Sequence, residues 1–296
     1  MKLLAFVSLA AALGAASATY TEVVNGVTYI TSGPSRAASL AEYERPTYFT
    51  ALQLLSDRLS AADAPRWNRH QPLPKLKAEL KRVKDTLGSE GLSTALAKDI
   101  TDADAFWHDV IDTSTPGNMI PIDGRGVFFL PNITAVRFAL WFSSPLADMA
   151  NNDANAEHYF KRTVDIGDGV LEAEILEGWG GVTTLFSIDN FGKPDYTRHP
   201  FLRRQPEFPY QFAGDKVLRD GTGAVYGVLH ISVRDVNGAD YGETRNGTEV
   251  LASLWYGDAA TDKFLQGESE HMVIEIINLS QQAQRDFDSG AFKPPV

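Results

Sequence analysis

The stretch AVYGVLHISVRD at residues 224–235 decides how the second half of the chain folds. Apolar and polar side chains alternate along it, which is the period of two that a β-strand imposes on its two faces. The alternation predicts one face that packs into a core and one mixed face. The core face holds Val225, Leu229, Ile231 and Val233, and the mixed face holds Tyr226, Val228, His230, Ser232 and Arg234.

Similar runs, each of roughly ten residues rich in Val, Ile, Thr, Phe and Tyr, surround this stretch, and Gly-containing turns separate them. Short, evenly spaced strands of this kind are typical of antiparallel hairpins. We therefore expect a curved antiparallel sheet of about six strands. The expected strands lie near 158–166, 170–177, 182–189, 214–219, 224–235 and 248–256.

The region 19–125 has mainly helical periodicity, with apolar residues three or four positions apart. Pro46 suits the first turn of a helix, where its missing amide hydrogen has no partner to lose. The expected elements are a short strand near 23–30, helices over 46–62 and 74–87, and a third helix that opens at Asp102 and Asp104.

The region 126–296 is expected to be β-rich and to end in a helix. Residues 270–287 combine a helical apolar face with β-branched residues that would suit a strand, and we favour the helix. Residues 132–150 fit either structure. A helical first half and a final helix packed on the sheet predict one compact α+β unit.

Residues 1–18 have the pattern of a cleaved secretory signal peptide: Lys2, an apolar run, and small residues up to Ala18. We therefore expect a secreted protein. No other stretch is long and apolar enough for a membrane span. Three glycosylation sequons, at Asn132, Asn246 and Asn278, predict a glycoprotein, with Asn246 in a polar, Gly-rich turn as the best acceptor.

Composition and missing motifs exclude several function classes. Without residues 1–18 the chain has 26 Lys and Arg against 38 Asp and Glu, a formal charge of −12, which argues against a nucleic-acid partner. The absence of cysteine excludes thiol nucleophiles and cysteine-based metal sites. The signatures of common hydrolases, zinc proteases and nucleotide or dinucleotide enzymes are missing as well. The sequence predicts neither a cofactor nor a metal.

The mixed face of 224–235 carries residue types that acid–base chemistry requires. His230 is the candidate acid or base, and Tyr226 and Arg234 are candidate donors to an oxyanion. Asp189 or Glu177, on neighbouring strands, could orient the imidazole. The alternative is that these residues are the solvent-facing side of a half-exposed sheet.

The connection 190–213 interleaves prolines with aromatic residues, so it is expected to pack on the sheet and cover a site. We expect Phe208 and Tyr210 from this loop, together with His158 and Trp179, to contact a substrate. Trp179 lies in a Gly-rich hairpin turn and suits either a ligand platform or the core.

These features favour an internal pocket for a small apolar or aromatic molecule and a cofactor-free lyase, isomerase or cyclase. A first alternative is a secreted interaction protein whose aromatic loop and Trp179 contact a partner. A second is a carbohydrate hydrolase that pairs Glu172, Glu174 or Glu177 with Asp189.

Overall fold

The computed structural model describes residues 19–32, 40–165 and 171–294, which form nine strands and six α-helices. The expected signal peptide lies outside the described residues. Among the described residues, no helix has both the length and the apolar character that a membrane span requires. The mixed α+β class and the C-terminal helix are confirmed.

All nine strands belong to one antiparallel sheet, in the order β1-β2-β3-β9-β8-β7-β6-β5-β4. The six expected strands are all present, but the expected number was too low, because three strands come from the first half of the chain. The strands are β1 (Thr19–Val24), β2 (Val27–Ser32), β3 (Met119–Phe128), β4 (His158–Asp165), β5 (Leu171–Trp179), β6 (Val182–Gly192), β7 (Tyr210–Leu218), β8 (Val225–Val236) and β9 (Gly247–Gly257).

The short strand expected near 23–30 is instead a hairpin of β1 and β2. Its two turn residues, Asn25 and Gly26, have φ angles of 51° and 78°, as a tight turn between antiparallel strands requires. The third additional strand, β3, crosses the boundary at residue 125 that we drew between the helical and β-rich regions.

The helices expected in the first half of the chain are present, but the third begins at Ala97, so Asp102 and Asp104 lie inside it and do not open it. Within α2, Gly88 has a non-helical backbone, so the first segment ends at Leu87, as the periodicity predicts. Most of 132–150 is helical, in two short helices at 135–142 and 145–154, and the helix over 270–287 is confirmed. Because α1 begins at Leu40, Pro46 lies inside it and not in its first turn. The helices are α1 (Leu40–Arg58), α2 (Leu73–Ala95), α3 (Ala97–Thr113), α4 (Ala135–Phe142), α5 (Pro145–Ala154) and α6 (Asp262–Ser289), with a short 3₁₀ helix, η1 (Gly238–Tyr241).

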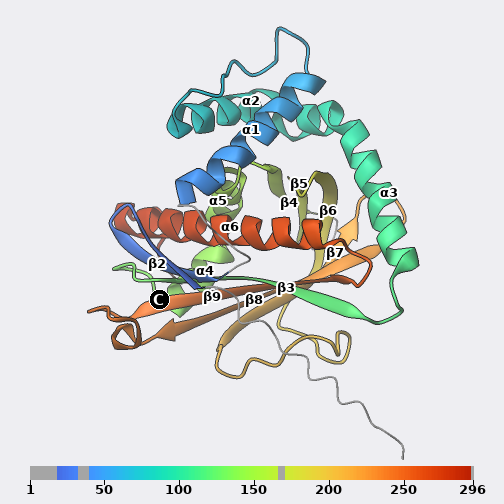
Figure 1. Ribbon diagram of the computed structural model, residues 1–296. Coiled ribbons are helices and arrows are strands. Elements are labelled where there is room, and N and C mark those ends of the chain that lie inside the picture. The colour runs from blue at the N-terminus through green and yellow to red at the C-terminus, as the bar shows by residue number, and fades with distance from the viewer. Residues whose placement is uncertain (1–18, 33–39, 166–170, 295–296) are drawn as a thin grey trace, which may run out of the picture.

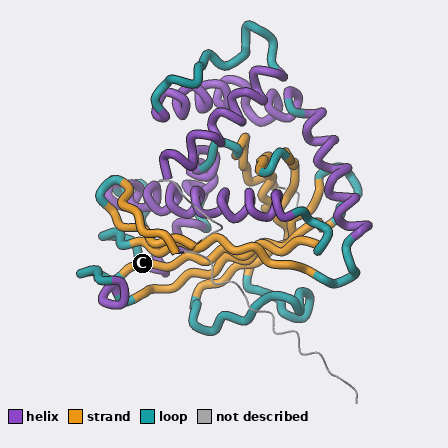
Figure 2. Tube along the Cα trace, in the orientation of Figure 1, coloured by secondary structure: helices purple, strands orange, loops and turns teal. Residues whose placement is uncertain are grey.

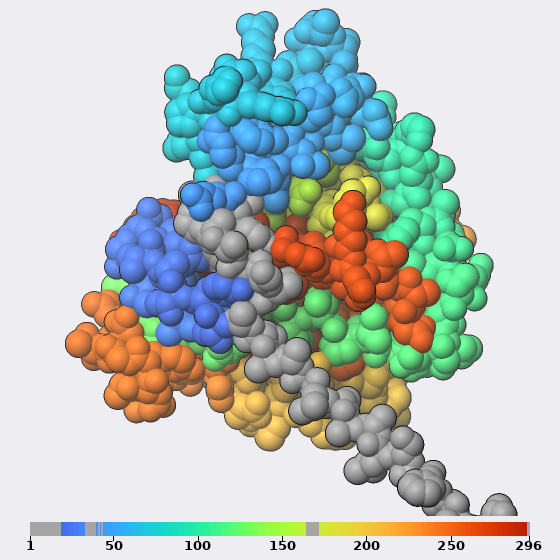
Figure 3. Space-filling model, viewed as in Figure 1, coloured from blue at the N-terminus to red at the C-terminus, as the bar shows by residue number. Residues whose placement is uncertain are grey.

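The curved sheet has helices on one side and the 193–209 loop on the other (Figures 1 and 2). We call these the helix face and the loop face. Helix α6 crosses the helix face (Figure 1), and its first turns lie beside α3 (Figure 3). Both faces of the central strands are therefore covered, as the aromatic loop led us to expect.

Glycines on β3 allow α6 to pack directly on the sheet. A Cβ atom added at Gly124 would lie 2.5 Å from Cβ of Met272, and one at Gly126 would lie 2.7 Å from Cγ2 of Ile276. Real Cβ atoms do not approach other atoms this closely, so larger residues at either position would push α6 outward. The helix is consequently buried on most of its surface.

A β-bulge changes the faces that alternation predicted for β8. Lys216 pairs with Gly227 and Val217 with Val225, which leaves Tyr226 as the extra residue. Tyr226 therefore packs in the main core on the helix face, together with Ile231 and Val233. Val228 stays on the loop face. The expectation that Tyr226 shares a face with His230 is wrong.

Candidate functional site

A pocket of about 860 Å³ lies between the helix face of the sheet and helices α4, α5 and α6. Its mouth includes exposed residues of the α4–α5 turn, Ser143 and Pro145, and Phe191 at the end of β6. Most of the wall is apolar, which suits a small apolar ligand. Apolar wall residues include Phe138, Phe186, Leu229, Leu254, Met272 and Leu279.

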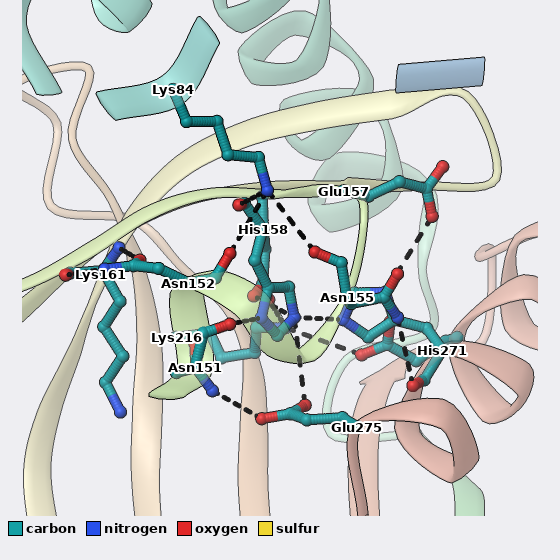
Figure 4. A network of polar contacts seen from close by, with 12 residues as sticks. Lys84, Asn151, Asn152, Asn155, Glu157, His158, Lys161, Lys216, His271 and Glu275 are labelled. Atoms are coloured by element: carbon teal, nitrogen blue, oxygen red, sulfur yellow. Dashed lines mark hydrogen bonds and ion pairs between the residues drawn. The ribbon is translucent and has the colours of Figure 1, made fainter. Parts of the chain in front are cut away.

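Besides Asp148, Lys161, Glu172 and Asp189, the ionisable side chains on the pocket wall are Glu177, Lys216 and Glu275. The last three belong to a larger buried polar cluster that gathers side chains from α2, β4, β5, β7 and α6 and from the end of α5 (Figure 4). The buried polar cluster consists of Lys84, Asn151, Asn155, Glu157, His158, Glu177, Lys216, Glu268, His271 and Glu275.

Two histidines lie at the centre of this cluster. Nε2 of His158 is 2.7 Å from Nε2 of His271, and the two rings face each other (Figure 4). A carboxylate oxygen of Glu177 lies 3.3 Å from the same Nε2 of His158, and one of Glu275 lies 3.9 Å from it. Among the described residues, His158, Glu177 and His271 form the one group that could hold a metal ion, although the sequence predicted none.

The tautomer of His158 follows from its other nitrogen. Nδ1 lies 2.6 Å from the backbone oxygen of Asn151, and a carbonyl can only accept, so Nδ1 carries the proton. In the neutral ring, Nε2 then presents its lone pair to His271 and Glu177. The register of β4 and β5 places His158 directly opposite Glu177.

Lys216 is the buried cation nearest to the pocket. Its ammonium group donates to the hydroxyl of Tyr256 at 2.9 Å and lies 3.6 Å from Glu268 and 3.9 Å from Glu177. The faces of Trp179 and Phe186 lie within 4.7 Å of the same nitrogen. Carboxylates and aromatic faces together stabilise the charge of a side chain that is only 2% exposed.

Burial shifts the protonation of the cluster strongly. Loss of water raises the pKa of Glu177 to about 8 and that of Glu275 to about 7, although Lys216 and Lys161 oppose part of each shift. Burial also lowers the pKa of His158 to about 3, so this ring is neutral at pH 7. Carboxyl groups that titrate near neutrality, on the wall of a pocket, are typical of functional sites.

Four residues that the sequence singled out lie together in this region. Glu177 and His158 are in contact, and Trp179 is buried with its ring 5.4 Å from that of His271. The sequence left Trp179 as either a ligand platform or a core residue, and the structure places it in the core. Tyr226 lies beside Lys216, whose ammonium group is 5.5 Å from the tyrosine ring.

His230 and Arg234 lie apart from the pocket, on the loop face. His230 contacts Gln211 and Ser232, and Arg234 pairs with Glu249, so neither is close to Glu177. The expected pairing of His230 with Glu177 is therefore wrong, because the sheet separates them. Asp189 lies opposite Asp215 in the register and lines the pocket, but it has no hydrogen bond to His230 among the described contacts.

The predicted loop residues do not reach the pocket. Phe208 is buried on the loop face under Arg234, whose guanidinium carbon is 4.7 Å from the ring centre. Tyr210 begins β7 and packs against the main core, but it is not part of the pocket wall. The residues expected to bind a substrate are thus divided between the two faces of the sheet.

The three sequons differ in exposure. Asn246 and Asn132 are exposed, and Asn132 donates from its amide nitrogen to Asp288. Asn278 lies within α6, and its amide nitrogen donates to Glu44 at 2.6 Å and to the carbonyl of Ala154 at 2.7 Å. A glycan on that nitrogen would leave it a single hydrogen, so at least one of the two contacts would be lost.

Sequence reasoning missed Lys216, Glu268, His271 and Glu275. Three of them lie on α6 with spacings of three and four residues, which is one face of a helix. This spacing is visible in the sequence, but we examined only the apolar face of the segment. Lys216 had no comparable signal, because a single lysine in a strand resembles any exposed one.

No family model matches this sequence, and the search of curated proteins gives no match either.

Proposed function

We propose that this protein binds a small, largely apolar molecule in the pocket between the sheet and α6 and transfers protons on it. The observation that supports this most is Glu275. It combines a place on the wall of an 860 Å³ pocket with a pKa raised to about 7 by burial. A carboxyl group of that pKa is divided between its acid and base forms at neutral pH, which is optimal for general acid–base catalysis.

Glu275 and Lys216 would divide the chemistry between them. The Glu275 carboxylate takes a proton from a carbon next to a carbonyl group of the ligand. The buried ammonium of Lys216 stabilises the negative charge that develops on the carbonyl oxygen. When that carbon also adjoins a carbon–carbon double bond, the negative charge is shared with the far end of the double bond. Return of the proton from Glu275 to that far end gives the conjugated isomer and restores the enzyme. The proposed reaction class is therefore an isomerisation without an organic cofactor.

The structure favours this proposal over a surface-binding role. Among the exposed large hydrophobic residues of the described part of the chain, Phe191 is the one aromatic. The aromatic loop packs inward, with Tyr196 and Phe201 against the cluster of Trp255 and Val228. A surface for a protein partner would instead present several exposed aromatic residues side by side. For a carbohydrate hydrolase, Glu172 and Glu174 are already paired with Arg219 and Arg162. Glu177 and Asp189 both line the pocket, but its mainly apolar wall suits an apolar ligand better than a sugar.

The first test is ligand binding by thermal shift, with aromatic, terpenoid, lipid and oligosaccharide compounds. A pocket ligand at 100 times its Kd stabilises by about 2.7 kcal/mol, which raises the Tm of a protein of this size by roughly 5–10 °C. Leu229→Trp fills the pocket from β8 and should abolish the shift. The matched control is Val225→Trp, an exposed site on the same strand that should retain it. Stabilisation by oligosaccharides alone, or by no compound, would contradict the proposal.

The second test detects the chemistry before the product is known. A bound carbonyl compound incubated with the protein in deuterated water should gain deuterium at the carbon from which Glu275 removes a proton. Glu275→Gln should lower the exchange rate by about 10²–10⁴-fold while the ligand still binds. Equal exchange in the variant and the wild type would show that Glu275 is not the base.

A further inference from the structure

We propose that His158, His271 and Glu177 form a binding site for one divalent transition-metal ion, beside the pocket. The inference goes beyond the proposed function, which uses none of these three side chains. It rests on convergent ligand atoms, on the contacts that orient them, and on the charge of the buried polar cluster.

The ligand atoms converge from three separate elements. His158 begins β4, Glu177 belongs to β5 and His271 lies on α6, and one ligand atom from each falls within 4.8 Å of the others. Two imidazoles and one carboxylate are a common set for zinc and for non-haem iron. Metal–nitrogen bonds of about 2.1 Å at a tetrahedral angle separate two nitrogens by roughly 3.4 Å. The 2.7 Å between the two Nε2 atoms would therefore widen by about 0.7 Å on binding.

Outer contacts orient both rings for this role. Nδ1–H of His158 donates to the carbonyl of Asn151, as the second nitrogen of a metal-bound histidine usually does. Nδ1 of His271 faces the side-chain amide of Asn155, which is 1% exposed and whose oxygen has no hydrogen-bond partner. Rotating that amide by 180° lets the oxygen accept from Nδ1–H of His271, at the expense of a 3.3 Å contact to the His271 carbonyl. Both Nε2 atoms then carry lone pairs and can act as ligands.

The charges of the cluster point to a cation as well. Its described residues include four carboxyl groups, Glu157, Glu177, Glu268 and Glu275, but only two amines, Lys84 and Lys216. One oxygen of Glu268 is buried without a hydrogen-bond partner. A divalent ion would stabilise the ionised forms of these buried carboxyl groups, which burial alone disfavours.

The test uses the metal alone as the probe. The protein is purified with a tag that lacks histidine, treated with a chelator and titrated with Zn²⁺ in competition with a chromophoric chelator. We expect one high-affinity equivalent. Loss of an outer-shell partner typically weakens metal affinity by about 10–100-fold. Loss of a ligand should weaken the Zn²⁺ affinity at least as much, and we expect this of each of three variants: His158→Gln, His271→Gln and Glu177→Gln. His230→Gln is the matched control, because His230 is equally buried on the loop face and should leave the affinity unchanged.

A spectroscopic measurement keeps the proposal falsifiable even when a variant fails to fold. X-ray absorption of the zinc-loaded wild-type protein should show two imidazole ligands. A shell of oxygen atoms alone, or a Zn²⁺ affinity that none of the three folded variants changes, would overturn the site and indicate ordinary surface carboxylates. The thermal-shift test on chelator-treated protein is independent of this result, so the two proposals can fail separately.

Discussion

Replacing Glu275 with glutamine should make the metal-free protein more stable at alkaline pH. The residue lies on the buried side of α6, where one carboxylate oxygen accepts from the amide of Asn151 at 2.6 Å. Burial raises its pKa from the ordinary 4.5 to about 7. Glutamine has the same shape as the protonated acid and can keep the bond to Asn151, but it never carries the charge that burial disfavours.

The size of the effect follows from the pKa shift. Because the pKa is higher in the folded state, this group's contribution to stability is fully present below pH 4.5 and is lost as the pH rises through 7. A shift of 2.5 units corresponds to about 3 kcal/mol, with 1.36 kcal/mol for each unit. Glu275→Gln should therefore gain up to about 3 kcal/mol at pH 8.5 and almost nothing at pH 4.

The assay is urea unfolding of chelator-treated protein at both pH values. The matched control is Glu90→Gln, an exposed carboxylate on α2, which should change the free energy of unfolding by no more than about 0.5 kcal/mol at either pH. A Glu275→Gln protein that is less stable than wild type at pH 8.5 would refute the reasoning, since a nearby cation would then hold the carboxylate ionised. The same variant should lose proton exchange, so stability and activity would oppose each other at this position.

Three further predictions concern the packing and the charges. Gly124→Ala should lower the free energy of unfolding by about 1–3 kcal/mol through collision with Met272, and an unchanged urea midpoint would contradict the close packing of α6 on β3. Lys216→Met should lower the free energy of unfolding by about 3–5 kcal/mol at pH 8, because Glu268 and Glu177 lose their buried cation. If urea unfolding shows no such loss, Lys216 and these carboxyl groups do not form an ionised pair. Burial lowers the pKa of His230 from 6.5 to about 4, so the unfolded chain takes up the proton first and stability should fall, by at most about 3 kcal/mol, as the pH drops from 6.5 to 4. His230→Gln should remove this part of the pH dependence. If the free energy of unfolding falls equally with pH in the variant and the wild type, His230 is not its source.

Local patterns in the sequence were sufficient for most of the secondary structure. Side-chain period and turn residues located the six strands of the second half and the helices of the first, because both depend on neighbours within a few positions. Two predictions of secondary structure were wrong because of turns and bulges that involve only a few neighbouring residues. A hairpin with the turn Asn25–Gly26 resembled a single strand, and the bulge at Tyr226 moved that residue to the other face of β8.

The candidate site depended on contacts that no local pattern contains. The sequence identified His158 and Glu177, but it paired Glu177 with His230, which lies across the sheet. His158 and His271 are 113 positions apart and meet only because α6 crosses the helix face of the sheet. The sequence by itself determined the six strands of the second half, the helices of the first half and the C-terminal helix, since these follow from the period of the backbone. The tertiary structure alone decided which polar side chains share one buried space, because burial, pKa and metal-binding geometry arise from elements that are distant along the chain.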